Sequence, residues 1–461
     1  MKTRLLSRLR NSESGNAPHA KGFVSPMLST FFKRLSKDCN GNILTITAAA
    51  LPLVMGSAGL ATDTIQWTLW KRQLQRAADS AAIAGVYQRA TDSGATTKVS
   101  TAVCHDINLN LHTNMSLLGT SPCTGSGGSP STLAYPADTT YSTNQVTVVL
   151  KVQQSLPFSS MFLSTPPTIT ATATAASVSA GGSACVEALA TSGTGIYNNG
   201  NTTVKAPTCI LFSNSTSANS ASAGGSSSVT AKAIAAVGGI QQSNNWSVQQ
   251  YIPYSPALPD PFANVTPDPN AMNCTTAALT ENTNFATLGT TNCFSDMSIG
   301  SNKTLNVPAN FGPIYINGGD IDLKGSFNCN GCTLVLTNKN TASNARIGTV
   351  SSNAQATNTI TAPTSGTFKG IAIYQDRRAT GNTNKVNGGS GSVLSGALYF
   401  PRDTLQINGT GDVVSLCAMF VANYVVFTGT SSIAISSPDD TACSGVGMPS
   451  NSATKMVRLI A

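Results

Sequence analysis

The chain has 461 residues and few charges, with 27 Lys and Arg against 19 Asp and Glu, so that only 10% of its side chains are charged. Most of the formal net charge of +8 comes from residues 1–42, which hold eight basic and two acidic side chains. Residues 43–461 carry 19 basic and 17 acidic groups, without a basic stripe or a recognisable nucleic-acid motif. The composition therefore argues against a nucleic acid as a partner.

The first predicted element is an uncharged stretch of 24 residues from Cys39 to Thr62. A helix of roughly 20 apolar residues is long enough to cross the hydrocarbon layer of a bilayer. We predict a basic cytoplasmic leader at 1–42 and one transmembrane helix at 43–62, because no second stretch has this character. The residues assigned to the membrane span are Ile43, Leu51, Pro52, Leu53, Gly56 and Leu60.

The leader also predicts the orientation of the chain. Lys33, Arg34 and Lys37 lie close to the span, and basic residues in that position stay in the cytoplasm. We therefore expect a single-pass protein of the inner (cell) membrane with its bulk in the periplasm. The alternative is a cleaved signal peptide, since Gly59-Leu60-Ala61 has the small residues of a cleavage site, but the long apolar run and the extended leader favour an anchor.

A helical pattern continues beyond the span. Trp67 and Trp70 lie where a helix would leave the bilayer, as interfacial aromatic residues do. Small residues then recur at three- and four-residue spacing, which lets another element approach closely. That element is either the protein's own sheet or a partner helix. The interfacial and helix-motif residues are Asp63, Trp67, Trp70, Leu74, Ala77, Ala78, Asp79, Ala81 and Ala82.

Four features of residues 38–90 stand in a fixed order: a Gly41-Asn42 start, an apolar helix with a central Leu51-Pro52, Asp63 at its exit, and a helix reading Leu-Gln-Arg-Ala-Ala-Asp-Ser-Ala-Ala at 74–82. Together they resemble the N-terminal domain of the TadE/TadG-like Flp (tight-adherence) pilus-assembly proteins. Strands expected at 146–150 and 169–178 resemble those that follow in this family. Segments 318–325, 374–379 and 396–401 resemble the C-terminal half of its longer members.

The resemblance implies a part of the Flp pilus machinery, held in the inner membrane, with other pilus-assembly proteins as partners. Two departures limit what it implies. Ile46 stands where members processed as pseudopilins have Glu after the cleaved Gly, so the leader is expected to be retained. The Asp-x-Ser-x-Ser motif of members with a von Willebrand A-type domain is absent from the sequence, so metal-dependent adhesion is not implied.

The rest of the chain predicts an α+β region of helix and short strands at 63–180, followed by an all-β domain at 181–461. In the second region short alternating runs are each closed by Gly, Asn or Asp. Their loose repetition favours a β-solenoid, most simply a right-handed parallel β-helix, and a sandwich is the second choice. Val426, inside the apolar run 424–427, is expected to be a core residue.

Ten of the eleven cysteines follow the span, and an even number in an exported region is typical of disulfides. Spacing does not determine the pairing, and the simplest expectation joins neighbours in the chain. For Cys329-Asn330-Gly331-Cys332 a structural disulfide or unpaired strand thiols remain open beside a redox or metal role, although one CxxC is a weak zinc signal. The expected pairs are 104–123, 185–209, 274–293, 329–332 and 417–443.

No catalytic, cofactor-binding or metal-binding residue is predicted, and the chain is not expected to be an enzyme. It has only three histidines, no Gly-x-Ser-x-Gly elbow and no phosphate-binding Gly-rich loop. His105 and His112 are more typical of a surface or capping role than of a metal site. The densest charge cluster, Asp376-Arg377-Arg378, indicates a solvated turn with an ion pair or, together with Lys369, a group that acts on glycans.

Two functions therefore remain. The first is a non-enzymatic, membrane-anchored periplasmic component of Flp/Tad pilus assembly, structural or scaffolding, for which contact with peptidoglycan is a further expectation. The second is a surface β-helical protein that binds or degrades polysaccharide.

Overall fold

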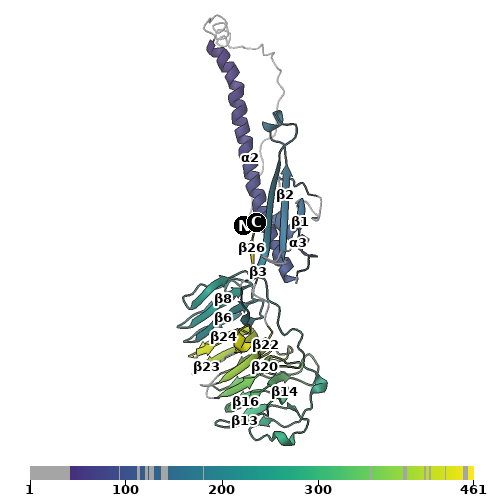
Figure 1. Cartoon of the computed structure of the whole chain (residues 1–461), viewed down its shortest axis with the longest axis vertical. Helices are drawn as coiled ribbons and strands as arrows, with labels where there is room; N and C mark the ends of the chain where they lie inside the picture. The colour runs from purple at the N-terminus through teal and green to yellow at the C-terminus, as the bar shows by residue number, and fades with distance from the viewer. Residues whose placement is uncertain are drawn as a thin grey trace, which may run out of the picture. The chain divides into compact units, whose positions relative to one another are not determined.

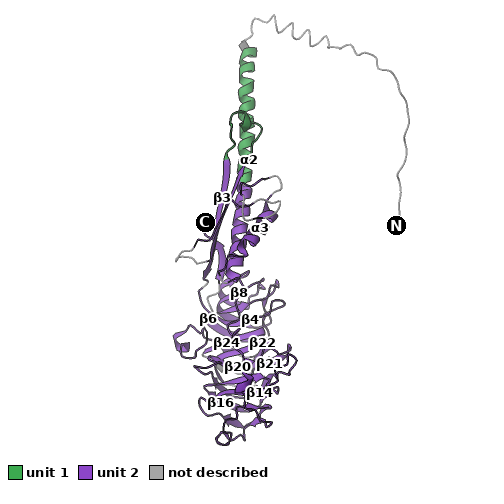
Figure 2. Ribbon diagram, turned by 90° about the vertical axis from the view of Figure 1, so that its right-hand side faces the viewer, with its two compact units in different colours: residues 1–70, 154–167 green, residues 71–153, 168–461 purple. Residues whose placement is uncertain are grey.

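The computed structural model describes residues 42–461, except 93, 112–114, 120–122, 124–128, 137–143, 180, 354–355, 388–391, 410–411, 415–416, 431 and 450–454. The leader up to residue 41 and His112 thus lie outside the described residues. The chain divides into two compact units, unit 1 with residues 1–70 and 154–167 and unit 2 with residues 71–153 and 168–461 (Figure 2).

One continuous helix, α2 (Asn42–Thr91), contains both the apolar stretch and the small-residue motif. Pro52 lies inside this helix without ending it, as proline does in membrane helices. A second helix, α3 (Val99–Asn110), follows in unit 2 and was not predicted, because the surrounding residues are polar and broken by glycine. Val99, Val103 and Ile107 form its buried stripe at four-residue spacing, a short helical signal in the sequence.

Four strands form an antiparallel sheet in unit 2: β1 (Thr132–Ala134), β2 (Gln145–Gln153), β3 (Thr168–Ser179) and β26 (Lys455–Leu459). Val146, Val148 and Leu150 alternate on the buried face of β2, as the period of a half-buried strand requires. The strands expected at 146–150 and 169–178 are β2 and β3. The last strand, β26, pairs with β3 although it lies almost three hundred residues further along the chain, and nothing in the sequence predicted that pairing.

The remaining strands form one large parallel sheet, here called the β-stack, which comprises β4 to β25 (Figure 1). From β11 to β19 each strand pairs with the third strand along the chain, as in the series β12–β15–β18–β21 and β13–β16–β19–β22. The chain therefore passes through about three strands before the next strand pairs with the first, which is compatible with the predicted solenoid. A sandwich of antiparallel sheets does not have this parallel pairing.

The strand bounds of the β-stack are β4 (Ala184–Ala188), β5 (Ile196–Asn198), β6 (Thr203–Ser213), β7 (Ala221–Ala223), β8 (Ser228–Ala236), β9 (Trp246–Ile252), β10 (Leu279–Thr280), β11 (Cys293–Phe294), β12 (Met297–Ile299), β13 (Thr304–Asn306), β14 (Gly312–Asn317), β15 (Ile321–Leu323), β16 (Ser326–Asn330), β17 (Cys332–Thr337), β18 (Val350–Ser352), β19 (Asn358–Thr361), β20 (Ile371–Gln375), β21 (Thr383–Lys385), β22 (Val393–Gly409), β23 (Asp412–Val414), β24 (Cys417–Gly429) and β25 (Ser432–Ala434). Short 3-10 turns lie at η1 (Ser159–Met161), η2 (Pro269–Ala271), η3 (Phe285–Thr287) and η4 (Thr441–Cys443).

The order of strands in the β-stack differs from their order in the chain. One line of paired strands runs β11, β14, β17, β20, β22, β24, β4, β6, β8, β9. The chain thus enters in the middle at β4, builds to β9, crosses through residues 253–278 to the opposite end, and returns until β24 pairs with β4. Figure 1 shows this β4–β24 seam where the teal and yellow strands meet.

The interior of the β-stack is a single apolar core in which Leu334, Phe400, Val425 and Phe427 are fully buried. Val426 is not part of it: this side chain is only partly buried, because it lies between the inward-facing Val425 and Phe427 on a strand. The expectation that Val426 is a core residue was wrong by one position in the strand. Successive residues of a strand point to opposite faces of the sheet, so Val425 lies in the core and Val426 does not.

Five disulfides join the ten cysteines after the apolar stretch, each to the next or previous cysteine in the chain: Cys104–Cys123, Cys185–Cys209, Cys274–Cys293, Cys329–Cys332 and Cys417–Cys443. The expected neighbour pairing is confirmed at every pair. Cys185–Cys209 joins the adjacent strands β4 and β6, and Cys417–Cys443 ties β24 to the segment that leaves the β-stack. The disulfides thus fix the strands at the seam and the crossing segment at its far end.

Candidate functional site

The first half of α2 is apolar and exposed. Ile43 is 78% exposed, Leu53 75% and Ile46 61%, and Leu51 and Leu60 are also exposed. Pro52 and Gly56 lie among them, and a Cβ added at Gly56 would contact nothing within 4 Å. Within the described residues, α2 is the one helix long and apolar enough, by length and composition, to cross a membrane. A helix that is apolar all round and unpacked suits a lipid environment.

The polar side chains of this half are satisfied within the helix itself. The hydroxyl of Thr47 donates to the carbonyl of Ile43 at 2.7 Å, and that of Thr64 donates to Leu60 at 2.7 Å. Ser57 and Thr62 donate in the same way to carbonyls three residues earlier. A hydroxyl in hydrocarbon has no water to bond, so these back-bonds remove the cost of placing it there.

Asp63 marks the end of the exposed apolar half. Its side chain is 4% exposed, and its Oδ2 accepts a hydrogen bond from the backbone N–H of Ser159 at 2.5 Å. One helical turn earlier, the ring of Phe158 packs on Gly59, where a Cβ would overlap it. Trp70 is buried and Trp67 half-buried on the same stretch of α2. Sequence reasoning placed Asp63 at the exit of the span but missed the loop that binds it.

The second half of α2 packs inside unit 2. Leu74, Ala77, Ala78, Ala81 and Ala82 are fully buried, whereas apolar residues of the first half are exposed. The missing side chain of Gly85 explains why small residues are needed here: a Cβ on it would lie 2.9 Å from Val146 Cγ1 of β2 and 3.0 Å from Val103 Cγ2 of α3. The small-residue face thus meets the protein's own sheet and its own second helix.

Polar contacts hold the same half of the helix to the antiparallel sheet. Gln75 Nε2 donates to Asp79 Oδ1 at 2.8 Å and to the carbonyl of Thr172 on β3 at 2.9 Å. Asp79 of the motif therefore orients a side chain that bonds the sheet. Arg89, near the end of α2, donates from Nη1 to the carbonyl of Gln145 at 2.5 Å.

The charge cluster Asp376-Arg377-Arg378 has structural partners. Arg378 Nη2 pairs with Asp376 Oδ2 at 2.8 Å and also donates to the carbonyl of Asn338 at 3.0 Å. Burial alone would raise the pKa of Asp376, but hydrogen bonds from Arg378 and Thr337 lower it below its ordinary value. The expected ion pair is therefore present, in a partly buried turn.

Arg377 binds the crossing segment 253–278. Its Nη1 donates to the carbonyl of Val265 at 2.7 Å, and its Nη2 lies 3.4 Å from Asp260 Oδ2 and donates to the carbonyl of Phe262. The Tyr399 hydroxyl donates to the same Asp260 oxygen at 2.7 Å, and Arg377 lies over the Tyr399 ring. Burial and the neighbouring Asp260 raise the pKa of Tyr399. These contacts clamp the crossing segment onto the β-stack, a role that the sequence did not reveal.

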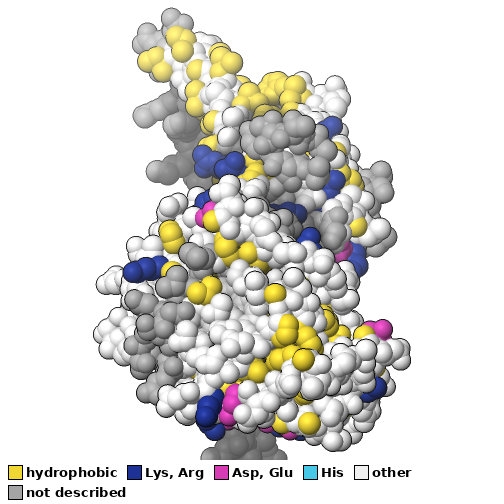
Figure 3. All heavy atoms as spheres, turned by 60° about the horizontal axis from the view of Figure 1, so that its bottom comes forward, with side chains coloured by type: hydrophobic (Ala, Val, Ile, Leu, Met, Phe, Trp, Pro, Cys, Tyr) yellow, Lys and Arg dark blue, Asp and Glu magenta, His cyan; other side chains and the backbone are white. Residues whose placement is uncertain are grey.

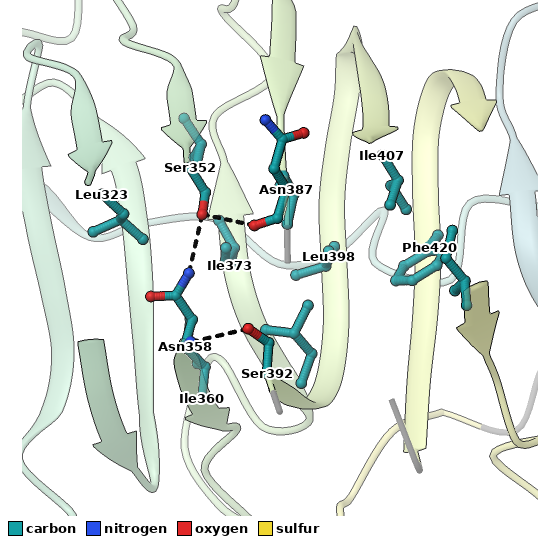
Figure 4. Close-up of a pocket in the computed structure, with 14 residues that line it drawn as sticks. Leu323, Ser352, Asn358, Ile360, Ile373, Asn387, Ser392, Leu398, Ile407 and Phe420 are labelled. Carbon is teal, nitrogen blue, oxygen red and sulfur yellow. Dashed lines mark hydrogen bonds between the residues drawn. The ribbon is translucent and has the colours of Figure 1, made fainter. Parts of the chain in front are cut away.

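A cavity inside the β-stack is too small for a ligand. It has a volume of about 20 Å³ and is lined mainly by aliphatic side chains (Figure 4). Several of its polar groups bond to one another: Asn358 Nδ2 donates to Ser352 Oγ at 3.0 Å, and Ser352 Oγ donates to the carbonyl of Asn387 at 2.8 Å. A space of this size holds about one water molecule.

No group of three or more His, Cys, Asp or Glu able to hold a metal ion occurs among the described residues. His105 is exposed on α3, and Cys329 and Cys332 are joined to each other. The visible surface of the β-stack carries few charged side chains and is mostly uncharged and polar (Figure 3). Among the described residues, the strongest candidate for a functional region is thus α2 with the elements packed on it.

The comparison with protein families also points to α2. Residues 41–95 match the family described as "Putative Flp pilus-assembly TadE/G-like". The match begins at the start of α2 and ends just beyond it, so it includes both the apolar half and the small-residue face. It confirms the predicted resemblance and its place, and it supports involvement in Flp pilus assembly. Neither the curated proteins nor the solved structures include a match to the chain.

Proposed function

We propose that the chain is a membrane-anchored, non-enzymatic component of Flp pilus assembly that lies mostly in the periplasm. The observation that carries the proposal is the coincidence of two independent findings on one helix. The family match covers residues 41–95, and the first half of the same helix is apolar, exposed and internally hydrogen-bonded. A helix of that kind is stable in lipid and costly in water.

The proposed organisation keeps the segments that the sequence indicates. Residues 1–42 are a cytoplasmic leader, 43–62 the transmembrane helix, 63–180 a Tad-like region of helix and strands, and 181–461 an extracytoplasmic β-rich domain. The excess of basic residues in the leader supports a cytoplasmic N-terminus. The five disulfides after the span support an oxidising compartment such as the periplasm.

The proposed role is structural or scaffolding, with other pilus-assembly proteins as partners and peptidoglycan as a further contact. Parallel strands that each lean on the next make a stiff body, which suits a scaffold. Two side chains considered for action on polysaccharide, Arg377 and Arg378, instead bond carbonyls and carboxylates of the protein itself, which supports the structural role.

Fusions to alkaline phosphatase test the orientation, because this enzyme is active only outside the cytoplasm. A fusion after residue 90 should be active and a fusion after residue 37 inactive, with equal amounts of both proteins on an immunoblot as the control. The reverse pattern would overturn the proposed topology.

Mass spectrometry of the mature chain tests whether the leader is retained, and it should find an N-terminus before Cys39. An N-terminus at Asn42 or Thr62 would contradict a retained anchor.

Deletion of the gene tests the assembly role. The deletion strain should lose surface pili and attachment, and the intact gene should restore both.

Arg377→Ala separates this proposal from the polysaccharide alternative, with Arg402→Ala as a matched control at a more exposed arginine nearby. We expect Arg377→Ala to lower thermal stability and to affect pili only through the amount of folded protein. Loss of attachment in an Arg377→Ala protein of normal stability would favour the alternative.

A further inference from the structure

The loop between β2 and β3, residues 154–167, presents a second exposed apolar surface beside that of the first half of α2. Met161 is 76% exposed, Phe162 67%, Leu163 45% and Phe158 39%. The fourteen residues of this loop include no charged side chain. Contiguous exposed apolar side chains are unfavourable in water and mark a surface that binds a partner or a membrane.

This loop belongs to unit 1, together with the first half of α2 (Figure 2). Asp63 Oδ2 accepts the N–H of Ser159, and the ring of Phe158 fills the space over Gly59. Both contacts fall at the end of the exposed apolar half of α2. The 20 residues of the proposed span rise about 30 Å, the thickness of the hydrocarbon layer, so the loop is attached where the helix reaches the outer face of the bilayer.

Five consecutive backbone N–H groups at the tip of the loop, from Ser159 to Leu163, are bonded without water. The N–H groups of Ser160, Met161, Phe162 and Leu163 donate to carbonyls within the turn at 2.8–3.2 Å, and that of Ser159 donates to Asp63. The hydroxyl of Ser160 donates to the carbonyl of Pro157 at 2.9 Å. Backbone that enters an apolar phase must have its N–H groups bonded internally, and this turn meets that condition.

We infer that residues 158–163 are a second membrane contact, a loop that inserts Met161 and Phe162 into the outer leaflet of the bilayer beside α2. The inference rests on the proposed membrane anchoring. Its occupant is phospholipid, because the apolar surface of the loop continues that of α2 at Leu60, which is 40% exposed, and both are uncharged. Buried Asp63 then acts as a positioning residue, since it holds the turn against the helix at the level of the headgroups.

Photo-crosslinking of the full chain tests the inference. A diazirine-bearing amino acid replaces Phe162, or Met161 in a second variant, in chains reconstituted into vesicles of phosphatidylethanolamine and phosphatidylglycerol. Leu53 in the proposed span is the positive control. Tyr251 of β9, which is 50% exposed, is the negative control for an exposed side chain of the β-stack. We expect lipid adducts at positions 53, 161 and 162 and none at 251, as measured by mass spectrometry.

The outcomes separate this inference from the anchoring on which it rests. Lipid adducts at position 53 without adducts at 161 and 162 would leave the anchor intact and overturn the membrane loop. Absence of lipid adducts at position 53 would overturn the anchoring and the loop together. Adducts between position 162 and a second protein molecule, in place of lipid, would show that the loop is a protein contact. Because these side chains are exposed, the replacements leave the packing of the loop unchanged.

Discussion

The two halves of α2 carry similar apolar residues in opposite surroundings. In the first half Leu53 is 75% exposed, whereas in the second half Leu74 is fully buried. Both halves contain Ala and Gly, but the halves differ in which side chains meet the protein. Bulky neighbours of Leu53, such as Val54 and Met55, are exposed, whereas the buried residues after Leu74 are the small Ala77, Ala78, Ala81 and Ala82. A bulky apolar surface suits lipid chains that adapt to it, and a surface of small residues lets a rigid sheet and helix approach closely.

The comparison teaches that hydrophobicity alone does not identify a protein core. The first half satisfies its hydroxyls within the helix, and the second half uses Gln75 and Arg89 to bond the sheet. Both halves are one uninterrupted helix, so the change of environment has to occur between about residues 60 and 70. Asp63 and the two tryptophans lie in that interval.

The largest effect is expected for a charge in the buried half. Leu74→Asp places an unpaired carboxylate in a fully buried position and should lower the free energy of unfolding by more than about 4 kcal/mol. Arg76→Asp, on the exposed side of the same helix, is the control and should change stability little. The measurement is the thermal midpoint of the detergent-solubilised chain and its resistance to protease. Equal loss in both variants would mean that Leu74 is not in a core.

A charge in the exposed half should instead affect membrane retention. Leu53→Arg costs about 2.5–3.5 kcal/mol at the centre of a span on insertion scales. The expected result is a larger fraction of the chain released by alkaline carbonate extraction, with Leu53→Ala as the control. Full retention of Leu53→Arg together with an unchanged disulfide pattern would contradict a lipid environment for this half.

Removal of the carboxylate at the boundary should free the loop. Asp63→Ala leaves the N–H of Ser159 without its acceptor and should cost about 1.5–3 kcal/mol, the usual contribution of a hydrogen bond to a charged group. Asp63→Asn keeps an acceptor oxygen and is the matched control. Chymotrypsin cleavage after Phe158 or Phe162 should become faster in Asp63→Ala than in Asp63→Asn. Identical cleavage in the two variants would show that this hydrogen bond does not position the loop.

The smallest effects come from two glycines of the same helix, and they should have opposite signs. Gly85→Ala adds a Cβ 2.9 Å from Val146 Cγ1 and should destabilise unit 2 by about 1–2 kcal/mol. Gly56→Ala meets nothing within 4 Å and should stabilise the helix by up to about 1 kcal/mol, because alanine restricts the unfolded chain. Thermal melts of both variants measure the difference. A stabilising Gly85→Ala would show that the face packs loosely.

The parts of the fold that the sequence predicts are those set by local pattern. The apolar stretch follows from an uncharged run of sufficient length, and the strands expected at 146–150 and 169–178 came from the family resemblance. The disulfides match the simplest expectation, that neighbours in the chain pair, although spacing alone did not determine it. What the sequence misses depends on long-range contacts. The pairing of β26 with β3, the clamp of Arg377 on Val265 and the bond from Ser159 to Asp63 join residues about one hundred or more positions apart. The one-residue error at Val426 arose because an unbroken apolar run hides which of two alternating faces is buried.

The seam between β4 and β24 has a consequence for the order in which the chain is made. Ribosomes deliver residues 184–252 first, but the strand that covers β4 on its other side is β24, and Cys209 Sγ contacts a carbonyl 226 residues further on, at Ile435. Until that late segment is synthesised, β4 has an open parallel edge, and closing such a long loop is slow. The nascent chain thus exposes an aggregation-prone edge until β24 has been made, and a truncation before residue 417 would leave that edge permanently uncovered.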